Sequence, residues 1–290
     1  MMLAGELNFV LPEPHTIIMK TPVNTFKKAL QNQQVQIGLW VDLADGLCTE
    51  LVAGIGYDWL LLDGEHGPSD LRTMLAQLQC VSSAIGSIPG LVTHPIARVP
   101  VGETTIIKQY LELGVQTLLV PMVDTAAQAA HMVRAMRYPP DGIRGMGSPV
   151  ARSSRWQGYP DYIHEANAQV CLLVQVETVE ALSNLDTIAA TPGVDGVFIG
   201  PADLSASMGF PGNPGHPEVQ AAIADGMARI LKAGKAPGII ATTEEQARKW
   251  LAAGALFVAV GVDTMLLSDA ARSLLARFKS SAPQSLVGGY

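Results

Sequence analysis

Eight short apolar runs rich in β-forming residues alternate with amphipathic helical stretches from residue 36 onward. Such alternation predicts parallel strands joined by crossover helices. Strands are expected at 36–41, 59–63, 95–99, 117–121, 171–176, 196–199, 237–241 and 256–260. Helices are expected near 45–54, 69–83, 103–113, 125–136, 178–189, 216–233, 244–253 and 263–278. The eight units predict an α/β protein with a closed (β/α)8 TIM barrel, because no Gly-rich dinucleotide fingerprint follows the first run to favour an open sheet.

The chain length of 290 residues fits one such barrel, which commonly takes about 250 residues. We expect the barrel over 25–280, an N-terminal extension over 1–24 and a tail over 281–290. The first 18 residues contain Glu6 and Glu13 and are interrupted by Pro12 and Pro14, which does not fit a signal peptide. Met19 is a candidate natural start, with the residues before it an appended or mis-assigned extension. The expected helix ends carry a capping-box pattern at Thr243 and Gln246, and glycines at positions 54, 114, 234 and 254.

Composition excludes several classes of partner. The formal net charge is −7 and no Lys/Arg cluster occurs, so a nucleic acid is not expected to bind. No apolar run reaches the roughly 18 residues that span a membrane. The three cysteines, Cys48, Cys80 and Cys171, are widely spaced in apolar patterns, which indicates buried thiols in a reducing cytoplasm. The expected partner is a small molecule.

Several apolar runs end in polar side chains that a barrel would bring together. Active sites of TIM barrels lie at the carboxyl ends of the strands. The residues that follow or end the second, third, fifth and sixth runs should therefore share one mouth; they are Asp63, Glu65, His66, Arg98, Gln175, Glu177 and Asp203.

Glu177 and Asp203 come from adjacent strands and could offer two carboxylate oxygens to one divalent cation. Oxygen ligands suit Mg²⁺, Mn²⁺ or Co²⁺ better than a closed zinc site. A general acid/base pair and ordinary helix caps are the alternatives that spacing leaves open.

His66 and Arg98 are the candidate catalytic side chains. Asp63 lies three residues before His66 and could hold one ring nitrogen of the imidazole, which would fix its tautomer; a structural histidine is the alternative. Arg98 ends an apolar run, where a guanidinium needs a substrate oxyanion or an internal ion pair with Asp63 or Glu65. No lysine is well placed to form an imine, so an enolate here would depend on a metal.

Several motifs together resemble the class II pyruvate aldolases over roughly residues 25–278. They are Ile37-Gly38-Leu39-Trp40, Leu62-Asp63-Gly64-Glu65-His66, Leu119-Val120-Pro121-Met122, Arg137-Tyr138-Pro139-Pro140, Gly142-Ile143-Arg144-Gly145 and Gly200-Pro201-Ala202-Asp203-Leu204-Ser205. The resemblance implies a barrel whose last helix swaps between protomers in a homohexamer built from dimers. It also implies reversible cleavage of a 4-hydroxy-2-oxo acid to pyruvate and an aldehyde, here 4-hydroxy-2-oxoheptanedioate to pyruvate and succinate semialdehyde in homoprotocatechuate catabolism.

The resemblance also implies roles for individual residues. Glu177 and Asp203 would bind the divalent metal, Arg98 would contact the pyruvyl group, and His66 with Asp63 would handle protons. Gln175 and the segment Gly200, Pro201, Ala202 and Asp203 would line the pyruvate site.

The aldehyde end of the substrate is less constrained. Ile240 and the long Pro-, Gly- and Arg-rich interruption at 137–158 are candidates for its wall, and the apolar Ile240 suits a semialdehyde chain. The nearest alternative function is a related aldolase acting on 2-keto-3-deoxy sugar acids of the glucarate or rhamnonate type. A lyase acting on acyl-CoA thioesters is disfavoured by the sparse lysines, and a non-catalytic keto-acid binding protein by the expected proton-transfer set.

Overall fold

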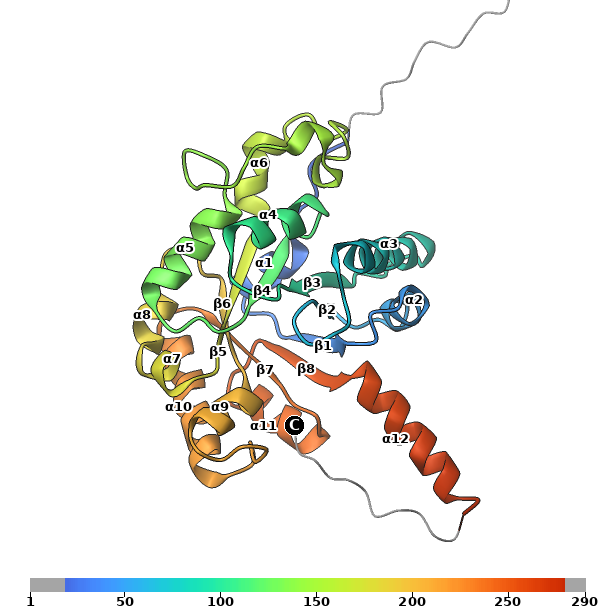
Figure 1. Cartoon of the computed structure of the whole chain (residues 1–290), viewed down its shortest axis with the longest axis vertical. Coiled ribbons are helices and arrows are strands. Elements are labelled where there is room, and N and C mark those ends of the chain that lie inside the picture. Colours follow the sequence, from blue (N-terminus) through green and yellow to red (C-terminus); the bar gives the residue numbers. More distant parts are fainter. Residues whose placement is uncertain (1–18, 280–290) are drawn as a thin grey trace, which may run out of the picture.

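The computed structural model describes residues 19–279 and shows eight parallel strands closed into a barrel (Figure 1). Each strand pairs with its neighbours in chain order, and β1 closes the ring on β8. The predicted barrel is confirmed, and the observed strand bounds lie within two residues of the predicted ones. The strands are β1 (Gln36–Val41), β2 (Trp59–Asp63), β3 (His94–Arg98), β4 (Thr117–Val120), β5 (Cys171–Val176), β6 (Gly196–Ile199), β7 (Ala236–Ile240) and β8 (Phe257–Val262).

All the predicted helices form, although the one expected at 178–189 is divided in two at Asn184. They are α2 (Gly46–Ala53), α3 (Leu71–Ser87), α4 (Thr104–Glu112), α5 (Ala126–Met136), α7 (Val179–Ser183), α8 (Leu185–Ala190), α10 (Pro217–Lys232), α11 (Glu244–Ala252) and α12 (Asp263–Ala276). Thr243 caps α11 by accepting the N–H of Gln246 at 3.3 Å. The further helices are α1 (Thr25–Gln31), α6 (Tyr162–Gln169), α9 (Pro201–Ser207) and two 3₁₀ turns, η1 (Ser148–Val150) and η2 (Arg152–Ser154).

The core has two layers, one between the strands and the surrounding helices and one inside the barrel. Phe26 of α1 lies in the inner layer, where its ring stacks on His94 at 5.6 Å between centroids and meets Trp59 and Phe257 edge-on. Asn24 fixes α1 there through a 2.9 Å hydrogen bond from its side-chain amide to Thr117 Oγ1. Aromatic side chains and α1 thus fill the amino-terminal end of the barrel.

The segment 137–158 lies at this same amino-terminal end. Gly158 accepts the N–H of Met19 at 3.2 Å, and Arg152 donates to Leu113 O at 2.5 Å, beside the connection into β4. The expectation that this segment lines the aldehyde wall is therefore wrong for its own barrel. The physical reason is topological, because a segment between a helix and the next strand returns to the amino ends of the strands.

The last helix, α12, projects away from the barrel instead of packing along it (Figure 1). Its exposed apolar side chains include Leu266, Leu267, Leu274 and Leu275. Of the cysteines, Cys171 is buried as expected, whereas Cys48 and Cys80 are half-buried because they lie on the outer helices α2 and α3. Within residues 19–279, none of the helices combines the length and apolar character needed to cross a bilayer.

Candidate active site

A cavity of about 570 Å³ opens at the carboxyl ends of the strands. It brings together most of the predicted site residues, namely Asp63, His66, Arg98, Gln175, Gly200, Pro201, Ala202, Asp203 and Ile240. Glu177 lies directly behind this wall, because a Cβ added at Gly200 would stand 2.6 Å from Glu177 Oε2. Arg98 is the single Arg or Lys among the lining residues of the described chain. The cavity therefore combines one buried cation with several acidic groups.

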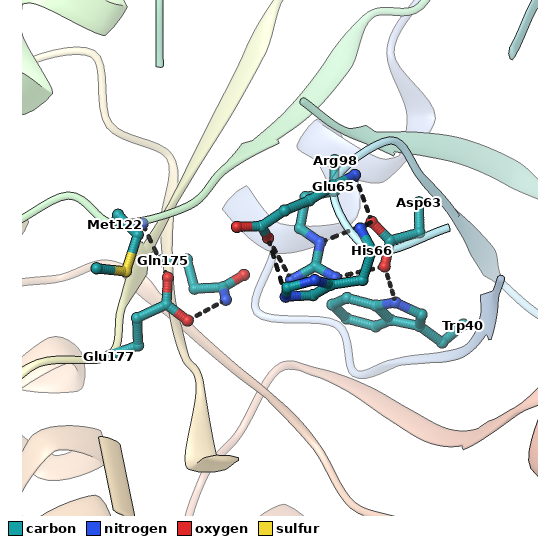
Figure 2. Close-up of polar contacts among 8 residues, drawn as sticks. All are labelled: Trp40, Asp63, Glu65, His66, Arg98, Met122, Gln175 and Glu177. Carbon is teal, nitrogen blue, oxygen red and sulfur yellow. Dashed lines mark hydrogen bonds and ion pairs between the residues drawn. The ribbon is translucent and has the colours of Figure 1, made fainter. Parts of the chain in front are cut away.

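Arg98 lies between two carboxylates (Figure 2). Its Nε donates to Asp63 Oδ1 at 3.0 Å, its Nη2 donates to Asp63 Oδ2, and its Nη1 lies 2.7 Å from Glu65 Oε2. The guanidinium carbon stands 4.8 Å from the centroid of the Trp40 ring, whose Nε1 donates to Asp63 Oδ2 at 2.8 Å. Both internal ion pairs that the sequence left open for Arg98 are present, and the cation still faces the cavity.

Burial and ion pairing act against each other in this cluster. Burial would raise the pKa of Asp63, but the hydrogen bonds and charge of Arg98 outweigh it and hold the pKa well below its usual range. The same pairing raises the pKa of Arg98 although burial opposes it. The pKa of Glu65 is raised, chiefly by burial. Ion pairing thus favours the charged forms of Asp63 and Arg98, whereas burial favours the neutral form of Glu65.

His66 stands at the open edge of the cavity, with 66% of its side chain exposed. Asp63 Oδ1 accepts the backbone N–H of His66 at 3.2 Å and that of Glu65 at 2.8 Å, and not a ring nitrogen as the sequence suggested. The reason is that both Asp63 oxygens turn inward to Arg98 and Trp40. The imidazole Nε2 instead lies 3.9 Å from Glu65 Oε2. Glu65, not Asp63, is the carboxylate beside the ring.

Glu177 follows β5 and is 2% exposed. Its Oε1 accepts the backbone N–H of Met122 at 2.8 Å, and its Oε2 accepts from the side-chain amide of Gln175. Burial, reinforced by the charges of Asp203 and Glu65, raises the pKa of Glu177 from its usual 4.5 to about 7. Figure 2 shows this pair set apart from the Arg98 cluster. Glu177 is therefore a buried carboxylate held in place by neutral donors.

Two glycines allow these groups to approach. A Cβ at Gly200 would overlap Glu177 and would stand 3.2 Å from Gln175 Nε2. A Cβ at Gly64 would lie 2.6 Å from the backbone oxygen of Arg98, and that oxygen accepts the N–H of Gly64 at 2.9 Å. Both positions need a residue without a side chain because backbone or fixed polar atoms occupy the space.

The donor set fits a divalent cation. Glu177 supplies a buried carboxylate, and Asp203 adds a second carboxylate from the first turn of α9. Gln175 Oε1 is buried and accepts no hydrogen bond within the described chain. Residues 19–279 contain no cluster of three or more His, Cys, Asp or Glu side chains arranged to hold a metal. Two carboxylates with open remaining positions suit Mg²⁺ or Mn²⁺, which retain water or take substrate oxygens.

The other half of the cavity is neutral. Beyond Ile240 its wall includes Thr242, Gln246 and Gln220. Lys249 stands behind this wall, where its Nζ lies 2.5 Å from Gln220 Oε1. A substrate that reached past Ile240 would meet hydroxyl and amide groups first, with one ammonium group behind them.

Three further residues, Trp40, Asp42 and Met122, help to build the site without a predicted role. Trp40 and Asp42 lie at the end of β1, and both line the cavity. The rule that selected Asp63 after β2 applies equally to Asp42 after β1 and would have found it. Met122 bonds Glu177 through a backbone with a φ of 55°, and residue type gives no signal of such a contact.

A closed barrel whose carboxyl-terminal mouth gathers a buried arginine, paired carboxylates and a histidine is the framework of an enzyme acting on a small anionic molecule. Residues 36–270 match the model of the HpcH/HpaI aldolase/citrate lyase family, and the chain belongs to this family. It is accordingly a carbon–carbon lyase of the pyruvate aldolase type.

Named relatives cover nearly the whole chain. A hydroxypyruvate/pyruvate aldolase of Pseudomonas aeruginosa is 59% identical over 91% of this chain and 96% of its own length. A 4-hydroxy-2-oxo-heptane-1,7-dioate aldolase of Salmonella dublin is 56% identical over 91% of this chain and 97% of its own. The crystal structure of a family member from Burkholderia cenocepacia superimposes with a TM-score of 0.84 at 38% identity, covering 88% of this chain and 99% of that one.

Proposed function

We propose that this enzyme cleaves 4-hydroxy-2-oxoheptanedioate reversibly to pyruvate and succinate semialdehyde, as a step of homoprotocatechuate catabolism. The observation that carries the proposal is the position of Arg98, a buried guanidinium facing the cavity beside Gln175 and the segment 200–203. A cation held there can bind the pyruvyl oxygens and stabilise the negative charge that develops when the C3–C4 bond breaks. The name of the 56% identical relative supports the choice of substrate.

Each residue of the site has a proposed role that follows from its position in the cavity. Glu177 and Asp203 would hold a divalent metal ion, with Mg²⁺, Mn²⁺ and Co²⁺ as the candidates. When bound, the ion would act as a Lewis acid for the pyruvyl oxygens. His66 stands at the open edge, where its ring can accept the proton of the C4 hydroxyl during cleavage and return it during synthesis. The carboxylate beside the ring is that of Glu65, whose Oε2 lies 3.9 Å from His66 Nε2. Ile240 provides an apolar surface for the carbon chain of the aldehyde.

The testing experiment measures pyruvate release from racemic 4-hydroxy-2-oxoheptanedioate, coupled to lactate dehydrogenase, with chelator-stripped enzyme before and after Mg²⁺ or Mn²⁺ is added. Turnover restored by metal supports the proposal. Folded protein that releases no pyruvate with any of these ions refutes the assignment of substrate. Ligand-induced stabilisation without turnover of any 4-hydroxy-2-oxo acid would instead indicate a keto-acid binding protein.

A second candidate differs in the keto acid. The 59% identical relative is named a hydroxypyruvate/pyruvate aldolase, so hydroxypyruvate is a second candidate donor. The neutral wall at Thr242, Gln246 and Gln220 can also hydrogen-bond a hydroxylated acceptor, which keeps sugar-acid substrates in the comparison. Aldol addition with pyruvate or hydroxypyruvate as the donor, and succinate semialdehyde or a hydroxyaldehyde as the acceptor, ranks these activities directly.

We also propose that α12 packs on a partner protomer within a homohexamer. The helix projects from its own barrel and exposes four leucines, while α2 exposes Leu47 and Leu51, one turn apart, and Ile55 is exposed just after its C-cap. Exchanged α12 helices could cover such apolar faces. Sedimentation of the full chain and of a Leu274→Asp, Leu275→Asp double variant tests this, because the charges should reduce the assembly to smaller species.

The free thiols are consistent with a reducing cytoplasm.

A further inference from the structure

Asp42 is a carboxyl group of the cavity that the proposed chemistry leaves without a role. It follows β1 directly, and its backbone N–H donates to Asp263 Oδ1 at 2.9 Å. Its side chain lines the cavity with Trp40 and Asp63. One of its oxygens, Oδ1, is buried and receives no hydrogen bond from any described residue. A buried carboxylate oxygen without a donor is costly, so the protonation state of Asp42 needs an explanation.

The neighbour of Asp42 supplies that explanation. The side chains of Asp42 and Asp63 line the same cavity, and a hydrogen bond joins their carboxyl groups. Two carboxylates can share a hydrogen bond only if one of them carries a proton. Asp63 already accepts hydrogen bonds from Arg98, from Trp40 and from two backbone N–H groups, all of which favour its ionised form. The proton therefore belongs on Asp42.

The charges that face Asp42 also favour its protonated form. Asp63 on β2 and Asp263 on α12 are anionic neighbours, and Arg98 on β3 is the opposing cation. Burial, the hydrogen bond with Asp63 and these negative charges raise the pKa of Asp42 from its usual 3.8 to about 7. Ionisation of Asp42 would add a third carboxylate charge to a cluster in which Arg98 already forms ion pairs with Asp63 and Glu65.

We propose that protonated Asp42 is a positioning residue for substrate binding: its carboxyl donates a hydrogen bond to Asp63, and thereby leaves the field of Arg98 available to the carboxylate of the 2-oxo acid. Once Asp42 loses its proton, the cavity wall becomes anionic and repels that carboxylate. The inference rests on the proposed function to the extent that the substrate is an anionic 2-oxo acid bound beside Arg98.

Asp42→Asn is the decisive variant, because an asparagine amide can donate to Asp63 at every pH and cannot ionise. The matched control is Asp45→Asn, three residues further along at the exposed N-cap of α2, where asparagine caps equally well. KM and kcat are measured from about pH 6 to about pH 9 for both variants and the natural enzyme, alongside calorimetric binding of pyruvate to the metal-loaded proteins. Thermal unfolding at each pH confirms that every sample is folded.

The expected results separate positioning from a merely structural contribution. In the natural enzyme and in Asp45→Asn, KM and the pyruvate Kd should rise above about pH 7, approaching tenfold per pH unit as one group ionises. In Asp42→Asn both should stay flat, with kcat at about pH 6 within a few-fold of the natural value. Asp42→Ala, which lacks the donor, should bind pyruvate more weakly even at about pH 6.

Two results would overturn the inference. Asp42→Asn could keep the natural pH dependence of pyruvate binding, which would assign that dependence to another group. Alternatively, kcat of the folded variant could collapse at about pH 6, which would make Asp42 a direct participant in proton transfer. Failure of the proposed function is distinguishable, because it would appear as absent turnover in the natural enzyme while the pyruvate-binding comparison still tests Asp42.

Discussion

Asp63 and Arg98 are register partners at the ends of the neighbouring strands β2 and β3, and Arg98 bonds both oxygens of Asp63. The strand pairing itself therefore sets the direction of the guanidinium. Arg98 in turn stacks over Trp40 from β1, so three successive strands fix one cation. Such a group needs little reorganisation when a negative charge forms near it, which is the condition for strong electrostatic catalysis.

Arg98→Lys should lower kcat by about 10²–10³, because an ammonium group cannot replace the planar pair of bonds to Asp63 and also face the substrate. Steady-state kinetics of pyruvate release measure the effect. An Arg98→Lys enzyme with unchanged kcat would remove Arg98 from the mechanism.

Asp63→Asn leaves the buried guanidinium with a weaker partner and should lower the free energy of unfolding by about 3–5 kcal/mol.

His66→Ala should lower kcat by about 10²–10⁴, the usual cost of losing a positioned base, while leaving metal affinity unchanged. His131 offers a matched control, since its ring bonds Thr104 Oγ1 at 3.0 Å on the outer helices. His131→Ala should keep normal turnover. Near-normal kcat in the His66 variant would instead make this histidine a bystander at the cavity edge.

Glu177 should make the stability of the metal-free enzyme depend on pH. Its pKa is higher in the folded chain than its usual value, so protonated Glu177 favours folding below about pH 4.5, and this contribution is lost as the pH rises through about 7. A divalent ion needs the ionised form, so Mn²⁺ should raise Tm more at about pH 8 than at about pH 5.

Glu177→Gln is the comparison for that measurement. The amide cannot ionise, and the variant should lose both the Mn²⁺ response and the activity together. A natural enzyme whose Tm responds equally to Mn²⁺ at both pH values, or a Glu177→Gln variant that keeps the response, would place the metal elsewhere.

Lys249 should contribute to binding of a second carboxylate at the far end of the substrate, since its ammonium stands behind Gln220. Lys249→Met should raise KM for 4-hydroxy-2-oxoheptanedioate by less than about tenfold, because the group is solvent-exposed. KM for 4-hydroxy-2-oxopentanoate, which lacks the second carboxylate, should not change. The control is Arg248→Met, whose side chain pairs with Glu244 on the outer surface. Equal effects of Lys249→Met on both substrates would exclude the contact.

Much of the barrel and its mouth could be predicted from the sequence, because strand periodicity and the convergence of strand ends are properties of the chain itself. Asp63, Arg98, Gln175 and the 200–203 segment reach one cavity for that reason. The partner of the His66 ring could not be predicted, since it depends on which way the Asp63 oxygens turn. Helix α9 is too short to show a helical period, and the projection of α12 depends on packing that the chain does not encode locally.

The packing of Phe26 and its aromatic neighbours in the barrel interior makes the cavity a dead end. Arg98 and Gln175 lie deep in it, at 5% and 3% exposure, whereas Thr242 and Gln246 stand nearer the solvent. Molecules held at the two depths must pass through the same opening in sequence. If the proposed function is correct, we expect cleavage to release the aldehyde before pyruvate and synthesis to require pyruvate first, because aromatic side chains close the opposite end of the barrel.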